Sequence, residues 1–267
     1  MVNTHRIMKV LRLGQSLCSS NGAGDSFKNL YSLDFDGVDD YLLIPDANVL
    51  SINNSGANRG FSISFWLKRT AASGGEILIN KGSFFSAGAY HFEYVVTTNY
   101  LHRMKFIVYG NDNSSIFQQI ILDQSIAFET WTHIGLTFDL GSTSGSLKGY
   151  INGVYNSGAA YASGGTWAAA ANTVSPLEFA KVSAAYGESK LDEVAIFDDE
   201  LSLAQMQDIY NSGTPTDLSN ESYLVGYWRN GDPTGTGAYP TITDQSSNSN
   251  DGVMTNMVAG DIVSDAP

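Results

Sequence analysis

The sequence predicts an all-β protein, a sandwich of antiparallel strands with one short helix. Two observations lead to this prediction: apolar and polar residues alternate along many short segments, and turn-forming residues, including 27 glycines, separate them. A period of two is typical of a strand that has one face in a core. About a dozen such segments with a single helical one favour a β-sandwich over a helical or mixed fold.

Composition and charge narrow the possible functions. Of the 267 residues, 43% are hydrophobic and only 15% are charged, which allows a large core. The formal net charge of −13 disfavours binding to nucleic acid or to anionic lipid. The single cysteine, Cys18, excludes an intrachain disulfide and a Cys-x-x-Cys zinc site. No apolar run approaches the roughly 18 residues of a membrane-spanning helix.

Residues 1–29 are predicted to form an N-terminal arm that precedes a sandwich of residues 30–267. Arg6, Lys9 and Arg12 interrupt the apolar residues of the arm, which a signal peptide would keep contiguous. These three residues are the only basic cluster of an acidic chain. We therefore predict that they dock onto an acidic partner surface or a second copy of the chain. The alternative is a solvated tail.

The predicted strands follow one another with short turns. Between two of them, Asn152-Gly153 has the residue types of a type I′ turn, which predicts a hairpin. In chain order the predicted strands are residues 31–35, 41–44, 61–67, 76–79, 91–97, 101–109, 116–122, 134–138, 147–151, 177–180 and 191–197.

One helix is predicted after the last of these strands. Ser202 and Gln205 have the spacing of a capping box, and apolar residues follow at helical spacing. Gly213 and Pro215 are expected to end the helix.

Five of these segments, in order, resemble laminin G-like domains of the concanavalin A-like lectin/glucanase jelly-roll class. The resemblance implies a jelly-roll sandwich over about residues 31–213, and agreement of five pieces in order makes it specific for the fold. It implies no single function, because this fold hosts enzymes, lectins and structural modules. The segments are residues 35–41 (FDGVDDY), 61–68 (FSISFWLK), 131–138 (WTHIGLTF), 147–153 (LKGYING) and 191–197 (LDEVAIF), the last followed by Leu201-Ser202.

Two C-terminal segments resemble sequence motifs that family members often have near their N-terminus. These segments are residues 224–228 (LVGYW) and 244–252 (DQSSNSNDG). We predict that residues 223–256 fold back and supply strands that the sandwich otherwise lacks, as in a circular permutation. The alternative is the start of a second, incomplete copy, which could not bury its apolar face alone. The sequence around residues 253–257 also resembles that of structural proteins of marine bacteriophages.

No enzymatic activity is predicted. Retaining glycosidases need two carboxylates about 5–5.5 Å apart, which glucanase relatives place in an E-x-D-x-x-E string that is missing here. Glu188, Asp192 and Glu193 have the wrong spacing. His133 has no motif-marked nucleophile and is interpreted as a structural histidine.

The resemblance also implies a structural Ca²⁺ ion. Its expected ligands are the Asp192 carboxylate of the last strand and oxygens at Gly37 and Asp39 in the first loop, because Ca²⁺ prefers oxygen ligands. The alternative is that the acidic residues solvate a turn and that Asp192 accepts hydrogen bonds from backbone amides.

Aromatic residues in the predicted loops are candidates for stacking on sugar rings. Tyr155, Tyr161, Trp167 and Tyr186, with Asn156 beside them, form the predicted glycan-binding set. The alternative is that these aromatic residues cover core edges or make subunit contacts.

The predicted function is a non-enzymatic virion structural protein, a capsid decoration or fibre-head subunit at the virion surface. Its expected partners are other virion proteins or copies of itself, together with host surface glycans. The alternatives are an extracellular carbohydrate-binding or adhesion module and, less favoured, a glycan hydrolase.

Overall fold

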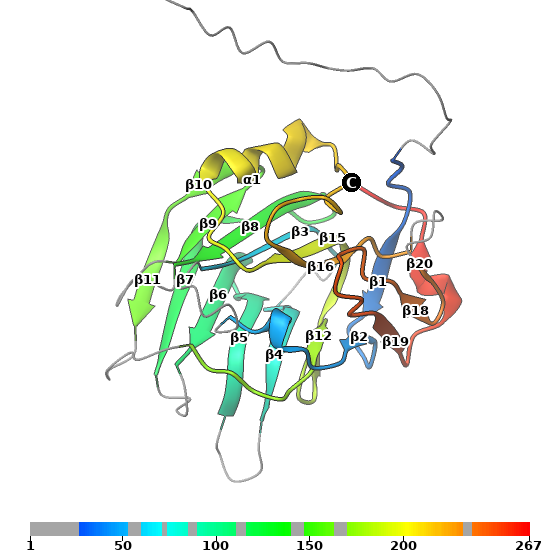
Figure 1. Cartoon of the computed structure of the whole chain (residues 1–267), viewed down its shortest axis with the longest axis horizontal. Coiled ribbons are helices and arrows are strands. Elements are labelled where there is room, and N and C mark those ends of the chain that lie inside the picture. The colour runs from blue at the N-terminus through cyan, green and yellow to red at the C-terminus, as the bar shows by residue number, and fades with distance from the viewer. Residues whose placement is uncertain are drawn as a thin grey trace, which may run out of the picture.

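The fold is a sandwich of two large antiparallel sheets that pack face to face around one core (Figure 1). The computed structural model describes residues 27–52, 60–70, 74–84, 90–110, 116–139, 147–162, 170–231 and 237–267. The predicted all-β sandwich with one short helix is confirmed. Within these ranges, no helix has the length and apolar character needed to cross a membrane.

The first sheet has eight strands. One edge of β15 borders β3, and the other borders β1 along its first half and β16 along its second. The order is β10 (Val154–Asn156), β9 (Lys148–Ile151), β8 (Thr132–Phe138), β3 (Phe61–Arg69), β15 (Glu188–Phe197), β1 (Ser32–Asp36) and β20 (Ile262–Val263), with β16 (Leu224–Trp228) also on β15.

The second sheet has ten strands, and a separate two-stranded hairpin is formed by β13 (Lys181–Val182) and β14 (Ala185–Tyr186). The order of the ten strands is β11 (Gly158–Ala162), β7 (Phe117–Ser125), β6 (Arg103–Tyr109), β5 (Tyr90–Thr98), β4 (Ile77–Phe84), β12 (Leu177–Phe179), β2 (Tyr41–Ile44), β19 (Gly252–Thr255), β18 (Thr241–Ile242) and β17 (Gly237–Ala238). Among the described residues there are also three single-turn helices: η1 (Asn48–Leu50), η2 (Asn211–Gly213) and η3 (Ala259–Asp261).

Apolar residues at alternate positions of the strands point into the core between the two sheets. In β3, the four apolar residues at odd positions lie in the main core, whereas Ser64 and Trp66 point to the outer face. In the ten-stranded sheet, Phe106 and Val108 of β6 face the same core. The predicted hairpin is present as well, because Asn152 and Gly153 have φ values of 50° and 69°, as a type I′ turn requires.

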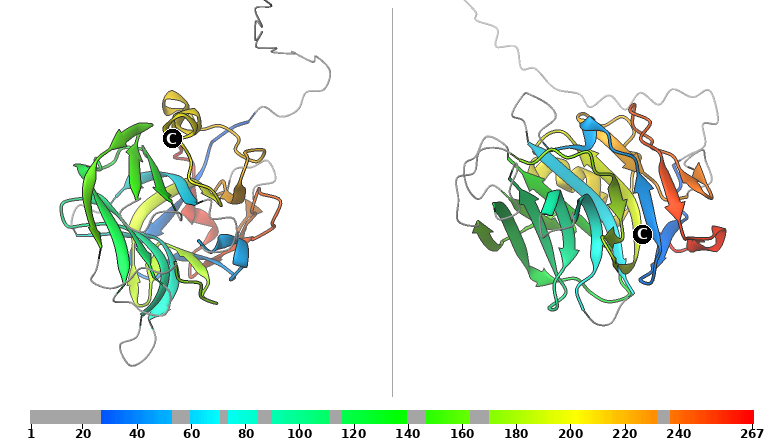
Figure 2. Two further views of the ribbon diagram at one scale, coloured as in Figure 1. Left: turned by 60° about the vertical axis from the view of Figure 1, so that its left-hand side comes forward. Right: turned by 90° about the horizontal axis from the view of Figure 1, so that it is seen from below.

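Helix α1 (Leu203–Tyr210) covers the outer face of the eight-stranded sheet (Figures 1 and 2). Its predicted capping box is present, with Ser202 accepting from the Gln205 amide. Met206 and Ile209 pack onto a second apolar cluster on that face. Gly135 allows this close approach, because a Cβ atom there would lie 2.6 Å from the Met206 sulfur.

The C-terminal segment contributes strands to both sheets. β16 pairs with β15, and β19 pairs with β2. Trp228 of β16 is fully buried in the main core, where its ring meets Phe179 edge-on with centroids 5.4 Å apart. The strands β16, β18 and β19 therefore belong to the two sheets, while the predicted domain bounds and the permutation stay predictions.

Asp244 explains why the 244–252 turn has its polar sequence. Its carboxylate accepts hydrogen bonds from the backbone amides of Tyr227, Ser246 and Asn250. The Ser246 hydroxyl and the Asn248 side chain also donate to the Val225 carbonyl. The turn is thus bonded to β16, which orders the end of the chain against the core.

Candidate functional site

A row of four aromatic rings crosses the outer face of the ten-stranded sheet. The rings belong to Phe92 of β5, Tyr109 of β6, Phe117 of β7 and Tyr161 of β11, which are four adjacent strands. Successive ring centroids lie 5.4, 5.9 and 5.7 Å apart. We refer to these four residues as the aromatic row.

Strand register puts most of the row on the outer face. Tyr109 and Phe117 are cross-strand partners, and their neighbours in the chain, Val108 and Gln118, are partners on the opposite side. Tyr161 is the partner of Gln119, so its side chain points the same way as Phe117. Side chains that are directly opposite or diagonal on one face of a sheet contact each other.

A β-bulge brings Phe92 into the row. The register between β4 and β5 shifts so that Phe92 pairs with Gly82 and Tyr94 pairs with Lys81, which leaves Glu93 as the extra residue. A bulge bends the strand and re-aims its side chains. Tyr94 consequently lies in the core, while the Phe92 ring contacts Tyr109.

Exposure increases along the row toward the edge of the sheet. Phe92 is 3% exposed and Tyr161 is 56% exposed, so one end is fixed by packing and the other is open to solvent. Gln119 is half-buried next to Tyr161 and adds an amide that can donate and accept hydrogen bonds. Successive rings are tilted by 38–48°, and an aromatic surface of this kind with a polar neighbour suits an amphipathic ligand.

The predicted glycan-binding set does not form one surface. Tyr161 belongs to the aromatic row, but Tyr155 lies on the outer face of the other sheet, where its ring meets Tyr150 edge-on. Tyr186 lies on the β13–β14 hairpin and contacts Tyr41. Asn156 uses its side-chain oxygen to accept from the amides of residues 123 and 124. The three described aromatic candidates lie in strands and not in the predicted loops, and they lie apart because β10, β11 and β14 belong to different sheets. Glycan binding by them stays a prediction.

Several predicted positions lie outside the described residues. These are Trp167 and the three basic residues of the arm, Arg6, Lys9 and Arg12. The sequence, in contrast, predicts no binding role for the other three members of the aromatic row. No local sequence pattern links Phe92, Tyr109 and Phe117, because only strand pairing and the bulge at Glu93 bring them together.

The structure does not bring the predicted calcium ligands together. Gly37 and Asp39 follow the end of β1, where Asp36 pairs with Glu188. Asp192 lies four residues further along β15, a span of about 13 Å at the usual strand rise. Asp192 is fully buried and accepts from the Glu193 amide, as in the alternative interpretation. This ligand set does not fit one ion, and calcium binding itself stays a prediction.

The acidic residues beside β1 line a cavity of about 400 Å³. Asp40 is only 5% exposed there, and burial, together with the negative charges of Asp36 and Asp261, raises the pKa of Asp40 from 3.8 to about 6. The cavity is lined by Asp34, Phe35, Asp36, Asp40, Thr70, Glu129, Glu188, Lys190 and Asp261.

Replacing Asp40 with asparagine is expected to flatten the pH dependence of stability. A carboxyl group with a raised pKa in the folded state favours folding below its unfolded pKa of about 4, and this contribution is lost as the pH rises through about 6. Asp40→Asn should therefore raise the melting midpoint more at pH 7 than at pH 4. Thermal melts of wild type, Asp40→Asn and Asp208→Asn, a control at an exposed position of α1, measure this. An equal shift of the Asp40→Asn midpoint at both pH values contradicts it.

His133 is a buried histidine that bonds to a buried serine. Its Nε2 lies 2.8 Å from the Ser64 hydroxyl oxygen, and its ring lies against Trp66 and Tyr210 with centroids 5.3 and 5.7 Å away. Burial lowers the pKa of His133 to about 3, so the imidazole is neutral at ordinary pH. His133 and Ser64 are 0% and 1% exposed, which closes this pair to solvent and to substrate.

Comparison with known proteins identifies the superfamily to which this fold belongs. A family model described as the concanavalin A-like lectin/glucanases superfamily matches residues 36–207. The chain belongs to this superfamily. The resemblance expected from the sequence is thereby confirmed. No curated protein sequence matches the chain.

Solved structures share the fold of this superfamily member at low identity. One is a Bacteroides ovatus protein whose assignment to carbohydrate binding is provisional, with 12% identity, a TM-score of 0.59, and 87% of this chain and 60% of that chain covered. The pentraxin of Limulus polyphemus has 12% identity, coverage of 68% and 82%, and a TM-score of 0.45. The sialidase of Trypanosoma rangeli has 13% identity, coverage of 70% and 28%, and a TM-score of 0.47. The likeness concerns the fold alone.

Proposed function

We propose that this superfamily member is a non-enzymatic carbohydrate-binding protein and that the exposed end of the aromatic row is its glycan contact. The observation that carries the proposal is the continuous row of rings across four strands, which ends in the exposed ring of Tyr161. Aromatic faces offer large, rigid contact area to the apolar C–H face of a sugar ring. Gln119 adds the hydrogen-bonding group that such a site needs for orientation.

Four further observations support carbohydrate binding without catalysis. The lectin-like fold and the provisional assignment of the Bacteroides ovatus protein both point to carbohydrate as the ligand class. The buried Ser64–His133 pair is closed to substrate, and the E-x-D-x-x-E string of the glucanases is missing from the sequence.

The test is the substitution Tyr161→Ala. Affinity for a bound glycan should fall at least tenfold, about 1.4 kcal/mol, because the ring that is open to the ligand is removed. A glycan array identifies a bound glycan, and isothermal titration calorimetry of wild type and variant then gives the ratio of dissociation constants.

Tyr155→Ala is the matched control, since Tyr155 is 51% exposed but lies on the other sheet. This control should bind like the wild type. An array on which the wild type binds nothing contradicts the proposal, and so does equal loss of affinity in both variants.

The finer predictions made from the sequence remain predictions. These are the role as a capsid decoration or fibre-head subunit, the virion-surface or extracellular location, and partners among virion proteins or copies of the chain. Mass spectrometry of purified particles tests the virion role, since absence of the chain from particles rules it out.

A further inference from the structure

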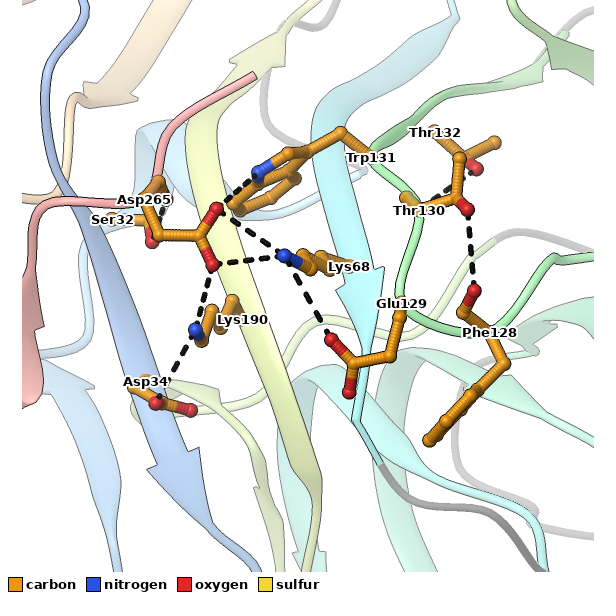
Figure 3. Close-up of polar contacts among 10 residues, drawn as sticks. All are labelled: Ser32, Asp34, Lys68, Phe128, Glu129, Thr130, Trp131, Thr132, Lys190 and Asp265. Carbon is orange, nitrogen blue, oxygen red and sulfur yellow. Dashed lines mark hydrogen bonds and ion pairs between the residues drawn. The ribbon is translucent and has the colours of Figure 1, made fainter.

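Two lysines of the eight-stranded sheet and Trp131, just before β8, donate to one carboxylate of the C-terminal tail, that of Asp265 (Figure 3). Lys190 Nζ lies 2.7 Å and Lys68 Nζ 3.0 Å from the Oδ2 atom of Asp265. The indole N–H of Trp131 donates to Oδ1 at 3.1 Å. Each carboxylate oxygen thus has a charged or neutral N–H donor within hydrogen-bond distance.

The donors are held in place by the sheet. Lys68 and Lys190 are direct cross-strand partners in β3 and β15, and Trp131 immediately precedes β8. Like charges directly opposite each other on neighbouring strands repel, so this pair of lysines favours an anion between their ammonium groups. Glu129 and Asp34 are more distant, at 3.8 Å from Lys68 and 3.7 Å from Lys190.

Asp265 is well matched to these donors. Burial alone would raise its pKa, but the hydrogen bonds from Lys190, Lys68 and Trp131 lower the pKa of Asp265 to about 2. The carboxylate is consequently ionised at every ordinary pH.

The tail itself is held by little else. β20 is two residues long and pairs only with Ser32 and Leu33. Residues 261–267 include no fully buried side chain, although Ile262 packs partly against the core. The Ser32 hydroxyl donates to the Asp265 carbonyl at 2.7 Å. A short strand with few buried groups opens at low free-energy cost compared with the core strands.

We propose that Lys68, Lys190 and Trp131 form a carboxylate-binding site which the C-terminal tail occupies through Asp265, and which binds a ligand carboxylate when the tail is displaced. This site is separate from the aromatic row, which lies on the other sheet. The flanking Asp34 and Glu129 disfavour doubly charged anions such as phosphate, since they add negative charge on both sides. A single carboxylate is therefore the ligand chemistry.

A carboxylate can come from an acidic sugar or from an aspartate of another protein. In both cases the ligand competes with the tail, whose effective concentration at the site is of the order of millimolar because it belongs to the same chain. The wild type should bind a free carboxylate weakly, and removing the Asp265 side chain should unmask the site.

The test compares full-length wild type with Asp265→Ala by NMR, following the indole N–H resonance of Trp131, which Trp131→Phe identifies. The probes are sodium glucuronate, with glucose as its neutral control, and N-acetylaspartate amide. Asp265→Ala should bind an acidic probe at least tenfold more tightly than wild type. A response to glucuronate alone identifies an acidic sugar as the ligand, and a response to the aspartate probe alone identifies a protein carboxylate.

Two further variants keep the result decisive. The double variant Lys190→Ala/Asp265→Ala should lose the binding gained by Asp265→Ala, and Ser264→Ala, a change in the same tail, should behave like wild type. If Asp265→Ala does not fold, the same titration of wild type at probe concentrations well above millimolar should shift the Trp131 resonance. Equal affinity of wild type and Asp265→Ala, or no response to either acidic probe, overturns the proposal.

Discussion

Replacement of Lys81 by methionine is expected to cost about 3–5 kcal/mol of unfolding free energy, because it leaves a buried charge without its partner. Lys81 and Glu93 are both 0% exposed, and their charged groups lie 3.2 Å apart. Lys81 also donates to Asp46 at 2.6 Å and to the Ser175 carbonyl at 2.8 Å. One side chain therefore joins β4 to β5 and to two loops. Urea denaturation at pH 7 measures the loss.

The double variant Lys81→Met/Glu93→Gln is the control for this interpretation. Glutamine removes the buried charge, while its side-chain oxygen can still accept from Ser51 and from the Thr173 amide, which bond to Glu93 at 3.2 and 2.7 Å. Part of the stability should return in the double variant, as expected for two groups that interact directly. A single variant that loses less than about 1 kcal/mol would place this pair among ion pairs of little net value.

Burial of this ion pair could not be predicted from the sequence. The strand containing Glu93 was predicted, but alternation says only that two faces differ. Two loops, which bring Ser51 and Thr173 to the Glu93 carboxylate, close over it. The bulge at Glu93 depends on the neighbouring strand. Such long-range contacts leave no local pattern, whereas β3 and α1 were predictable because their periodicity and capping residues are local.

In the candidate site, too, local sequence features could be predicted and long-range contacts could not. The sequence predicts Tyr161 in a loop, whereas the structure places it in β11 with 56% of its surface exposed. The short β11, with the sequence GAAYA, has too few large apolar residues to show alternation, so its pairing with β7 was not predictable. That pairing places the Tyr161 ring next to Phe117. In contrast, Asp192 was assigned to calcium through the family resemblance, and strand register contradicts that placement.

The C-terminal segment is expected to be essential for stability, and Trp228→Ala tests this with a single substitution. Trp228 is fully buried, contacts Phe179 and donates its indole N–H to the Asn250 carbonyl at 2.9 Å. Truncating a buried tryptophan to alanine leaves a large cavity and costs about 3–5 kcal/mol. The missing indole also leaves the Asn250 carbonyl without that donor. Thermal and urea unfolding of the variant measure the loss.

Val253→Ala is the matched control, because Val253 belongs to the same C-terminal segment but is 44% exposed. This change should alter stability by no more than about 0.5 kcal/mol, as is usual for exposed positions. If Trp228→Ala were equally mild, residues 223–256 would be a loosely attached extension. A large loss confined to Trp228→Ala instead means that β16 is part of the cooperative core, in line with its pairing to β15 in the eight-stranded sheet and with the burial of Trp228 between the two sheets.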